Sequence, residues 1–321
     1  MHYARYRTFG IGALTVSALA ISGCAAPASN SADDGVITIV ASTSIYGNIA
    51  EQIAGGRADV VSIVSGAAQD PHSYEASAQD QLTISRADLI IANGGGYDPF
   101  IDTLIDGSGS TAVVLNASEV SGLMDSDGED HAKRGDRAEG EDRAHIEGFN
   151  EHVWYSLHAV EKIAEKIAEK LGSLDAANAG EYRANYDAFA AEIAGLEARA
   201  TAIRETTDGG VAAVTEPVAV YLLEEIGLAN ETPTDFTEAI EEGADVSPSA
   251  LQAVLTLIES GTVVVLAYND QTESPETERV REAAQAAGVP VVSFLETLPE
   301  GSDYISWQKA NLEALAAALA A

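Results

Sequence analysis

The side chains best suited to chemistry in this sequence are two histidines in polar loops, out of six histidines among 321 residues. His72 lies in the proline-stiffened segment 70–75, DPHSYE, and His152 lies in the segment 150–154, NEHVW. A neutral imidazole nitrogen binds Zn²⁺ and other divalent transition metals, so both are candidate metal ligands. No local spacing rule links two histidines about eighty residues apart, and the alternative that each is an ordinary surface residue stays open.

Two glutamates follow apolar segments that have the composition of buried strands. Glu216 follows residues 211–215, and Glu296 follows residues 291–295. Ligand sites in open parallel sheets form outside the carboxyl ends of strands, which predicts that both carboxylates join the histidines in one cluster. The alternative is an acid at a helix N-terminus, where the macrodipole is worth about 0.3–1 kcal/mol, and the sequence leaves it open for both residues.

Two imidazoles and two carboxylates form a donor set that suits Zn²⁺, Mn²⁺ or Fe²⁺. The sequence has one cysteine, Cys24, and the lack of further thiolate ligands argues against copper(I). Zinc binds such donors more tightly than manganese by the general order of divalent affinities. Ligand identity therefore does not determine which metal is physiological.

The elements that must position this cluster alternate along the chain. Runs of β-branched residues predict strands over residues 36–41, 60–64, 87–93, 112–115, 211–215, 262–268 and 289–295. Apolar residues at three- and four-residue spacing predict helices over residues 46–54, 78–86, 156–171, 176–204, 216–226, 248–259, 276–287 and 304–319. Strands that alternate with helices are typical of an α/β fold with parallel sheets.

The length of the chain favours two lobes, because roughly 300 residues exceed the ~250 at which a single core usually divides. Residues 176–204 would form a helix of roughly 43 Å, at 1.5 Å per residue, which is long enough to span both lobes. We therefore expect a first lobe over residues 35–175, a linker helix over 176–205 and a second lobe over 206–321.

The N-terminal segment has the pattern of a secretory signal. Two arginines precede the apolar residues 9–20, a stretch too short to predict a membrane span, and Ile-Ser-Gly-Cys24 follows. This ending resembles the lipobox of bacterial lipoproteins, in which the cysteine is lipidated and becomes the first mature residue. The alternative is a plain signal peptide with a chance cysteine. We expect a signal over residues 1–23 and a flexible tether over 24–34, and the single cysteine allows no internal disulfide.

The net charge excludes one class of partner. Removal of the leader takes away Arg5 and Arg7 and changes the formal net charge from −34 to −36, so nucleic acid would be repelled.

Residues 124–148 are rich in Asp, Glu, Arg and Gly, have almost nothing apolar to bury and predict a mobile acidic loop. His131 and His145 in this loop are possible metal-capture residues.

Several segments together carry a resemblance to a known family. They are residues 41–46 and 49–55, 70–75, 87–94, 152–154, 215–217 and 221–223, with Tyr304, Asn311 and Leu312 near the end. These segments resemble the zinc- and manganese-binding receptor lipoproteins of bacterial ABC importers, from about Val36 to the end of the chain.

The resemblance implies a fold, a site and a set of partners. The fold is two α/β lobes joined by a long rigid helix, and the ligands carried over by position are His72, His152, Glu216 and Glu296. They would hold one divalent ion, Zn or Mn with Fe possible, as the transported ligand of a monomer. The partners would be an ABC permease and the membrane, to which lipid on Cys24 would anchor the protein on the extracytoplasmic face. Such a receptor is not an enzyme.

The chain departs from the family pattern in ways that leave the metal open. The second histidine motif usually has the form Pro-His-x-Trp-x-Asp-Pro, whereas His152 here follows Glu151 and lacks the Asp-Pro. Many zinc-selective members have a third histidine where this chain has Glu216, which resembles the manganese or iron members. The acidic loop resembles zinc members, although it has only two histidines.

Two other functions use the same residues. A metalloenzyme would need an open coordination position and a nearby general base, and no His-Glu-x-x-His spacing occurs. A surface adhesin would hold the metal for stability alone, and its chain should unfold when the metal is removed.

Asp303 is the second choice for the fourth ligand should Glu296 not be one.

Overall fold

The computed structural model describes residues 35–66, 69–124, 146, 148–207 and 209–320. The chain divides at residue 35, and the fold described below is that of the unit that begins at Val36. The expected signal, tether and Cys24 therefore lie outside the described residues, as do His131 and His145.

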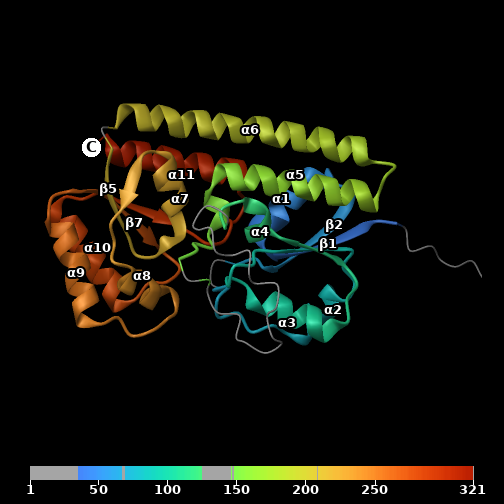
Figure 1. The fold of residues 1–321 in the computed structure, drawn as a ribbon, viewed down its shortest axis with the longest axis horizontal. Coiled ribbons are helices and arrows are strands. Elements are labelled where there is room, and N and C mark those ends of the chain that lie inside the picture. The colour runs from blue at the N-terminus through green and yellow to red at the C-terminus, as the bar shows by residue number, and fades with distance from the viewer. Residues whose placement is uncertain (1–34, 67–68, 125–145, 147, 208, 321) are drawn as a thin grey trace, which may run out of the picture. The chain divides into compact units, whose positions relative to one another are not determined.

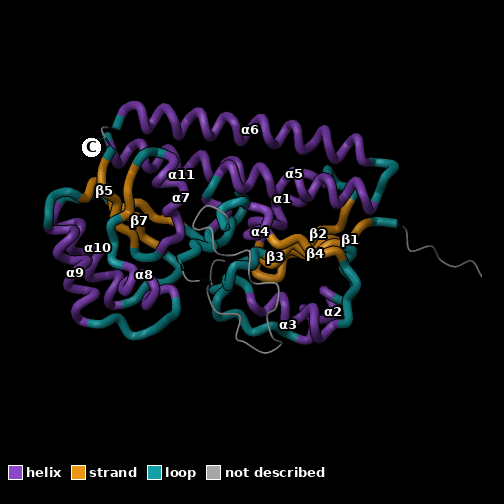
Figure 2. Tube along the Cα trace, in the orientation of Figure 1, coloured by secondary structure: helices purple, strands orange, loops and turns teal. Residues whose placement is uncertain are grey.

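Two four-stranded sheets, each entirely parallel, form the framework (Figures 1 and 2). The first has the order β2-β1-β3-β4, and its strands are β1 (Ile37–Thr43), β2 (Ala58–Val64), β3 (Leu89–Ala92) and β4 (Val113–Asn116). The second has the order β6-β5-β7-β8, and its strands are β5 (Gly210–Val214), β6 (Leu228–Asn230), β7 (Val263–Asn269) and β8 (Val291–Phe294). The predicted α/β fold with two parallel-sheet lobes is confirmed.

Helices connect the strands in both lobes. Those of the first half are α1 (Ser44–Ala54), α2 (Ala78–Ile84), α3 (Pro99–Ser108), α4 (Ala117–Ser121) and α5 (Leu157–Leu174). Those of the second half are α7 (Val220–Glu225), α8 (Thr234–Glu241), α9 (Pro248–Glu259), α10 (Pro275–Ala287) and α11 (Tyr304–Leu319). The sequence did not predict α3, α4, α8 or β6, which are short or lie among glycines, acids and prolines that weaken the helical pattern.

The predicted helix over residues 216–226 is wrong at its start. Glu216 has an extended backbone, and a 3₁₀ turn, η3 (Pro217–Ala219), separates it from α7. Proline fixes its own φ and disfavours the helical conformation in the residue before it, so Glu216 remains outside the helix. Its side chain is thereby left at the end of β5 instead of on a helix surface.

A single long helix, α6 (Ala179–Thr206), has 28 residues and connects the two halves (Figure 1). It contacts α1 and α5 of the first lobe and α7 and α11 of the second. Its buried residues recur alternately at four- and three-residue intervals, which places them on one face: Tyr182, Tyr186, Phe189, Ile193, Leu196, Ala200 and Ile203. The predicted long helix that joins the lobes is confirmed.

The largest hydrophobic cluster includes residues of both lobes. It extends from Ile39 of β1 through Trp154 and Tyr155 to Val214 of β5 and Phe294 of β8. Two buried tyrosines also form hydrogen bonds between segments that are far apart in the sequence. The hydroxyl of Tyr304 donates to the carbonyl of Trp154 at 2.7 Å, and the hydroxyl of Tyr155 donates to the carbonyl of Leu295 at 2.7 Å. The segment around His152 is therefore packed into a core shared by both sheets.

Candidate metal centre

His72 is positioned by a turn beyond the carboxyl end of β2. Asp70 accepts the backbone N–H of His72 at 2.9 Å with one carboxylate oxygen and the hydroxyl of Ser73 at 2.7 Å with the other. An aspartate that binds its own backbone two residues on stabilises such turns, and Pro71 restricts the chain further. The His72 ring then packs edge-on against Tyr97, with 4.7 Å between ring centroids.

His152 is completely buried and oriented by Asn150. Oδ1 of Asn150 lies 2.8 Å from Nδ1 of His152 and also accepts the His152 backbone N–H at 3.1 Å. An amide oxygen only accepts, so Nδ1 carries a hydrogen and the Nε2 lone pair is the one available for a ligand. This is the arrangement by which a second residue orients a metal-binding histidine.

The loop that carries His152 is hydrogen-bonded to both lobes. Asn93, at the end of β3, donates to the carbonyl of Glu151 at 3.0 Å. Asn150 donates to the carbonyl of Pro217 at 2.9 Å, and Tyr221 donates to the carbonyl of Asn150 at 2.7 Å. His152 is thus fixed relative to the first lobe through β3 and relative to the second through η3 and α7.

The two predicted glutamates lie beyond strands of the second sheet, with Asn269 between them. Glu216 follows β5, Glu296 follows β8, and Asn269 ends β7, the strand between those two in the sheet. Nδ2 of Asn269 donates to Oε2 of Glu216 at 2.5 Å and to Oε1 of Glu296 at 2.7 Å. Both carboxylates thus lie beyond the carboxyl ends of strands, on the side of a parallel sheet where ligand sites form.

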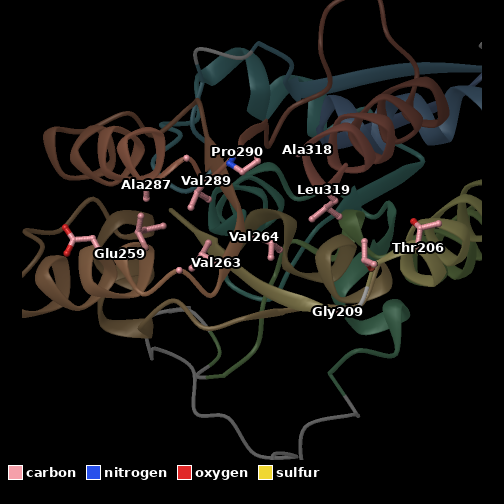
Figure 3. A pocket seen from close by; sticks show the side chains of 14 residues that line it. Thr206, Gly209, Glu259, Val263, Val264, Ala287, Val289, Pro290, Ala318 and Leu319 are labelled. Carbon is pink, nitrogen blue, oxygen red and sulfur yellow. The ribbon is translucent and has the colours of Figure 1, made fainter. Parts of the chain in front are cut away.

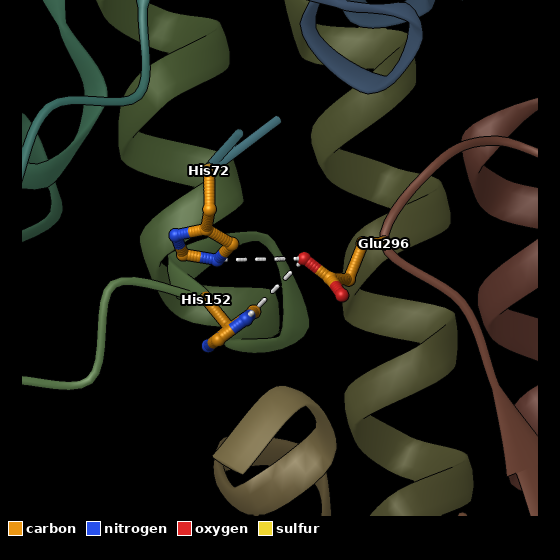
Figure 4. A group of neighbouring side chains, drawn as sticks. All are labelled: His72, His152 and Glu296. Carbon is orange, nitrogen blue, oxygen red and sulfur yellow. Dashed lines mark ion pairs between the residues drawn. The ribbon is translucent and has the colours of Figure 1, made fainter. Parts of the chain in front are cut away.

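Three of the four predicted residues converge (Figure 4). Oε2 of Glu296 lies 3.7 Å from Nε2 of His72 and 3.7 Å from Nε2 of His152. The ligand atoms of these three residues all lie within 4.8 Å of one another, close enough to bind one ion after small movements. Glu216 is not a member of this group but is linked to Glu296 through the Asn269 amide.

Comparison with known proteins identifies the chain. The family model described as zinc-uptake complex component A, periplasmic, matches residues 39–318. The chain belongs to this family. The zinc-uptake component A family consists of metal-binding receptors and not of enzymes.

Three proteins that this chain resembles are named for manganese or were solved with it bound. The manganese-binding lipoprotein MntA of Halalkalibacterium halodurans is 30% identical over 185 residues, 57% of this chain and 55% of that protein. The manganese ABC transporter substrate-binding lipoprotein PsaA of Streptococcus anginosus is 25% identical over 95% of this chain and 96% of its own. The structure of FpvC from Pseudomonas aeruginosa in complex with Mn²⁺ has a TM-score of 0.70 and 25% identity, covering 89% of this chain and 99% of that one.

Two glutamates that the sequence analysis did not propose as ligands also lie at the centre. Glu241, at the end of α8, has Oε1 3.8 Å from Nδ1 of His152. Glu151 is 1% exposed and forms a second possible group with His72 and Glu241. Glu151 could have been proposed from the sequence, because it directly precedes the candidate ligand His152. No local pattern indicated Glu241, because the helix that carries it, α8, was not predicted.

The buried charges shift the pKa values of the histidines. Burial by itself would lower the pKa of His152, but attraction to Glu296 and to two further glutamates raises it to about 9. Burial lowers the pKa of His72, with the charge of Glu296 opposing the shift. The two imidazoles thus differ in protonation although they face the same carboxylate.

The two carboxylates shift in opposite directions. Burial would raise the pKa of Glu296, but attraction to His152 holds it below its usual value. Burial, followed by repulsion from Glu296, raises the pKa of Glu216 to about 8. Without a metal, His152 and Glu216 are therefore the residues that hold protons near neutral pH.

The donor atoms fit a divalent cation. Nε2 of His152, Oε1 of Glu216 and Oε2 of Glu296 are buried, and the described residues offer them no hydrogen-bond partner. Buried polar atoms of native proteins normally have partners, and those without one call for an explanation. Two nitrogens and two carboxylate oxygens are ligands that Zn²⁺ and Mn²⁺ accept.

Other candidate features lie away from this centre. Asp303 accepts the backbone N–H of Ser306 at 2.7 Å and caps α11, so the structure gives it a helix-capping position. A cavity of about 700 Å³ is lined by Gly209, Val263 and Pro290, which precede or begin strands of the second sheet (Figure 3). It therefore lies at the amino ends of these strands, opposite the glutamates.

Within the described residues, no helix is both long and apolar enough to cross a membrane.

Proposed function

We propose that this protein is the extracytoplasmic receptor of a metal ABC importer, which binds one Mn²⁺ or Zn²⁺ ion between its lobes and delivers it to the permease. The observation that carries the proposal is the convergence of His72, His152 and Glu296 from both halves of the chain. Family membership and relatives named as manganese-binding lipoproteins support it. Fe²⁺ suits the same donors.

The proposed ligands are His72, His152, Glu216 and Glu296. Three of them already lie in one group, and the side-chain amide of Asn269 bridges Glu216 and Glu296. Both histidines must be neutral to bind the ion, so binding releases protons. A buried site built from both lobes suits capture of a single ion because water is excluded once the ligands close around it.

The location and partners follow from the sequence and the relatives. The signal over residues 1–23 and lipidation at Cys24 would tether a monomer to the extracytoplasmic face of the cell membrane through residues 24–34. Relatives named as ABC transporter substrate-binding lipoproteins support a permease partner. The lobe boundaries of this proposal are 35–175 and 206–321, with the linker helix over 176–205.

Titration of chelator-treated protein with Mn²⁺ and Zn²⁺ tests this function. We expect one ion to bind wild type, and Glu296→Gln or His72→Ala to weaken binding by more than about 100-fold, the upper range for removal of an outer-shell partner. His158→Ala is the matched control, because His158 is 66% exposed on α5 near Glu161. Binding that is equally tight in wild type and Glu296→Gln would contradict the proposed site.

Circular dichroism before and after chelation separates a receptor from a structural metal site. The shared hydrophobic core includes both sheets, so the metal-free protein should keep its helical signal. A structural metal would contribute folding free energy, and its removal would unfold the chain. Loss of the helical signal on chelation would favour the adhesin alternative.

A further inference from the structure

Asn269 uses both hydrogens of its side-chain amide on the two glutamates of the centre. Its Nδ2 lies 2.5 Å from Oε2 of Glu216 and 2.7 Å from Oε1 of Glu296. The NH₂ group faces the two carboxyl groups, while the amide oxygen faces the backbone N–H of Gln271. One amide thus occupies one oxygen of each carboxylate.

The position of Asn269 is fixed by its other contacts. Its Oδ1 accepts the backbone N–H of Gln271 at 3.0 Å, and its own backbone N–H donates to Oγ1 of Thr215 at 2.9 Å. The residue is 2% exposed and ends β7, between the strands that precede the two glutamates. The amide is therefore held in place before any ion arrives.

The carboxylate oxygens that Asn269 does not contact determine how many donor atoms the four proposed ligands offer to a metal ion. On the two glutamates that Asn269 contacts, the oxygens without a hydrogen bond from the described residues are Oε1 of Glu216 and Oε2 of Glu296. With one nitrogen from each of His72 and His152, the four proposed ligands offer four donor atoms. An N–H on one oxygen takes up one of its lone-pair sites and competes with a metal for that oxygen, which disfavours two-oxygen binding by either glutamate.

We propose that Asn269 is a positioning residue that sets the metal preference, by holding both glutamates to one-oxygen binding and so favouring four-coordinate Zn²⁺ over Mn²⁺. The inference rests on the proposed function. Zn²⁺ is usually tetrahedral with four ligands, whereas Mn²⁺ suits octahedral sites rich in oxygen. The centre is nearly closed to water, since Glu216 and Glu296 are 3% and 2% exposed, so solvent does not readily supply missing ligands.

The test compares Asn269→Ala with Asn230→Ala. Asn230 ends β6 of the same sheet, and its Oδ1 also accepts a backbone N–H two residues on, from Thr232 at 3.0 Å. It thus provides the same type of turn, and among the described residues its side chain forms no hydrogen bond with either glutamate. Dissociation constants for Mn²⁺ and Zn²⁺ are measured by competition with a chromophoric chelator.

We expect the ratio of the Mn²⁺ to the Zn²⁺ dissociation constant to fall by about tenfold or more in Asn269→Ala, the size of effect seen for outer-shell residues. The ratio should not change in Asn230→Ala. A merely structural role would weaken both metals by the same factor and leave the ratio of Asn269→Ala at its wild-type value, which would overturn the inference.

Co²⁺ bound to wild type gives a second measurement that needs no variant. Four-coordinate Co²⁺ absorbs visible light strongly, and six-coordinate Co²⁺ absorbs weakly, so the wild-type complex should absorb strongly. Weak absorption would overturn the inference while leaving the receptor function intact. If wild type binds none of Mn²⁺, Zn²⁺ and Co²⁺, the proposed function itself fails, and the two failures are thereby distinguished.

Discussion

Oε2 of Glu296 in the second lobe lies 3.7 Å from Nε2 of His72 in the first. The carboxylate is 2% exposed and the imidazole 12% exposed, so this contact between the lobes is almost closed to solvent. An ion bound by both residues would tie the lobes together through its own coordination bonds. Metal binding at the proposed site would thereby be coupled to the relative position of the lobes.

Asn150→Ala should weaken metal binding by about 10- to 100-fold, the range for partners that orient a metal ligand. The variant removes the oxygen that lies 2.8 Å from Nδ1 of His152, so the ring loses the contact that directs Nε2 toward Glu296. Isothermal titration with Zn²⁺ measures the effect. Asn178→Ala is the matched control, because Asn178 is a half-buried asparagine that bonds Asp175 near α6. Equal affinities of Asn150→Ala and wild type would contradict this role.

Metal affinity should rise with pH up to about pH 9. The pKa of His152 is raised to about 9 and that of Glu216 to about 8, so both hold protons below these values when no metal is present. A metal ion must displace these protons, which makes binding weaker at low pH and stronger as the pH rises. Titrations in buffers of different ionisation enthalpy count the protons released. An affinity that stays constant from pH 6 to pH 8 would contradict the prediction.

Glu225→Gln should stabilise the protein at pH 8 and have little effect at pH 4.5. Burial raises the pKa of Glu225 to about 7, while its carboxylate accepts the backbone N–H of Leu157 at 3.0 Å. The folded state therefore holds this proton more tightly than the unfolded state, and stability falls as the pH rises from about 4.5 to 7. The loss is on the order of 3 kcal/mol, at 1.36 kcal/mol per pKa unit.

Urea unfolding of wild type and Glu225→Gln at pH 4.5 and pH 8 measures this difference. The glutamine retains an oxygen that can accept from Leu157 but carries no charge to bury. A gain at pH 8 that is matched by an equal gain at pH 4.5 would show that the effect is not ionisation of Glu225.

Phe189→Ala should destabilise the protein by about 3–5 kcal/mol, the range for truncation of a buried aromatic side chain. Phe189 is 3% exposed on α6 and lies beside Tyr304 of α11, with 6.2 Å between ring centroids. Glu192→Ala, an exposed position on the same helix, should change stability by less than about 0.5 kcal/mol. Similar unfolding midpoints for the two variants would argue that α6 contributes little to packing between the halves.

The sequence by itself determined the elements whose patterns are local. Runs of β-branched residues predicted β1, β7 and β8, and three- and four-residue apolar spacing predicted α5 and α6, because side-chain periodicity depends on neighbouring residues alone. The family motif around His72 could also be recognised from the sequence, because it lies within the single segment 70–75. The short elements β6 and α8 were missed, and with them Glu241.

Only the tertiary structure decided which side chains meet. The sheet order β5-β7-β8 places Asn269 between Glu216 and Glu296, although α7, β6, α8 and α9 separate β5 from β7 in the chain and α10 separates β7 from β8. Glu216 is joined to Glu296 through this amide and is not a member of the histidine group. Strand order arises from long-range packing, which sequence periodicity does not encode.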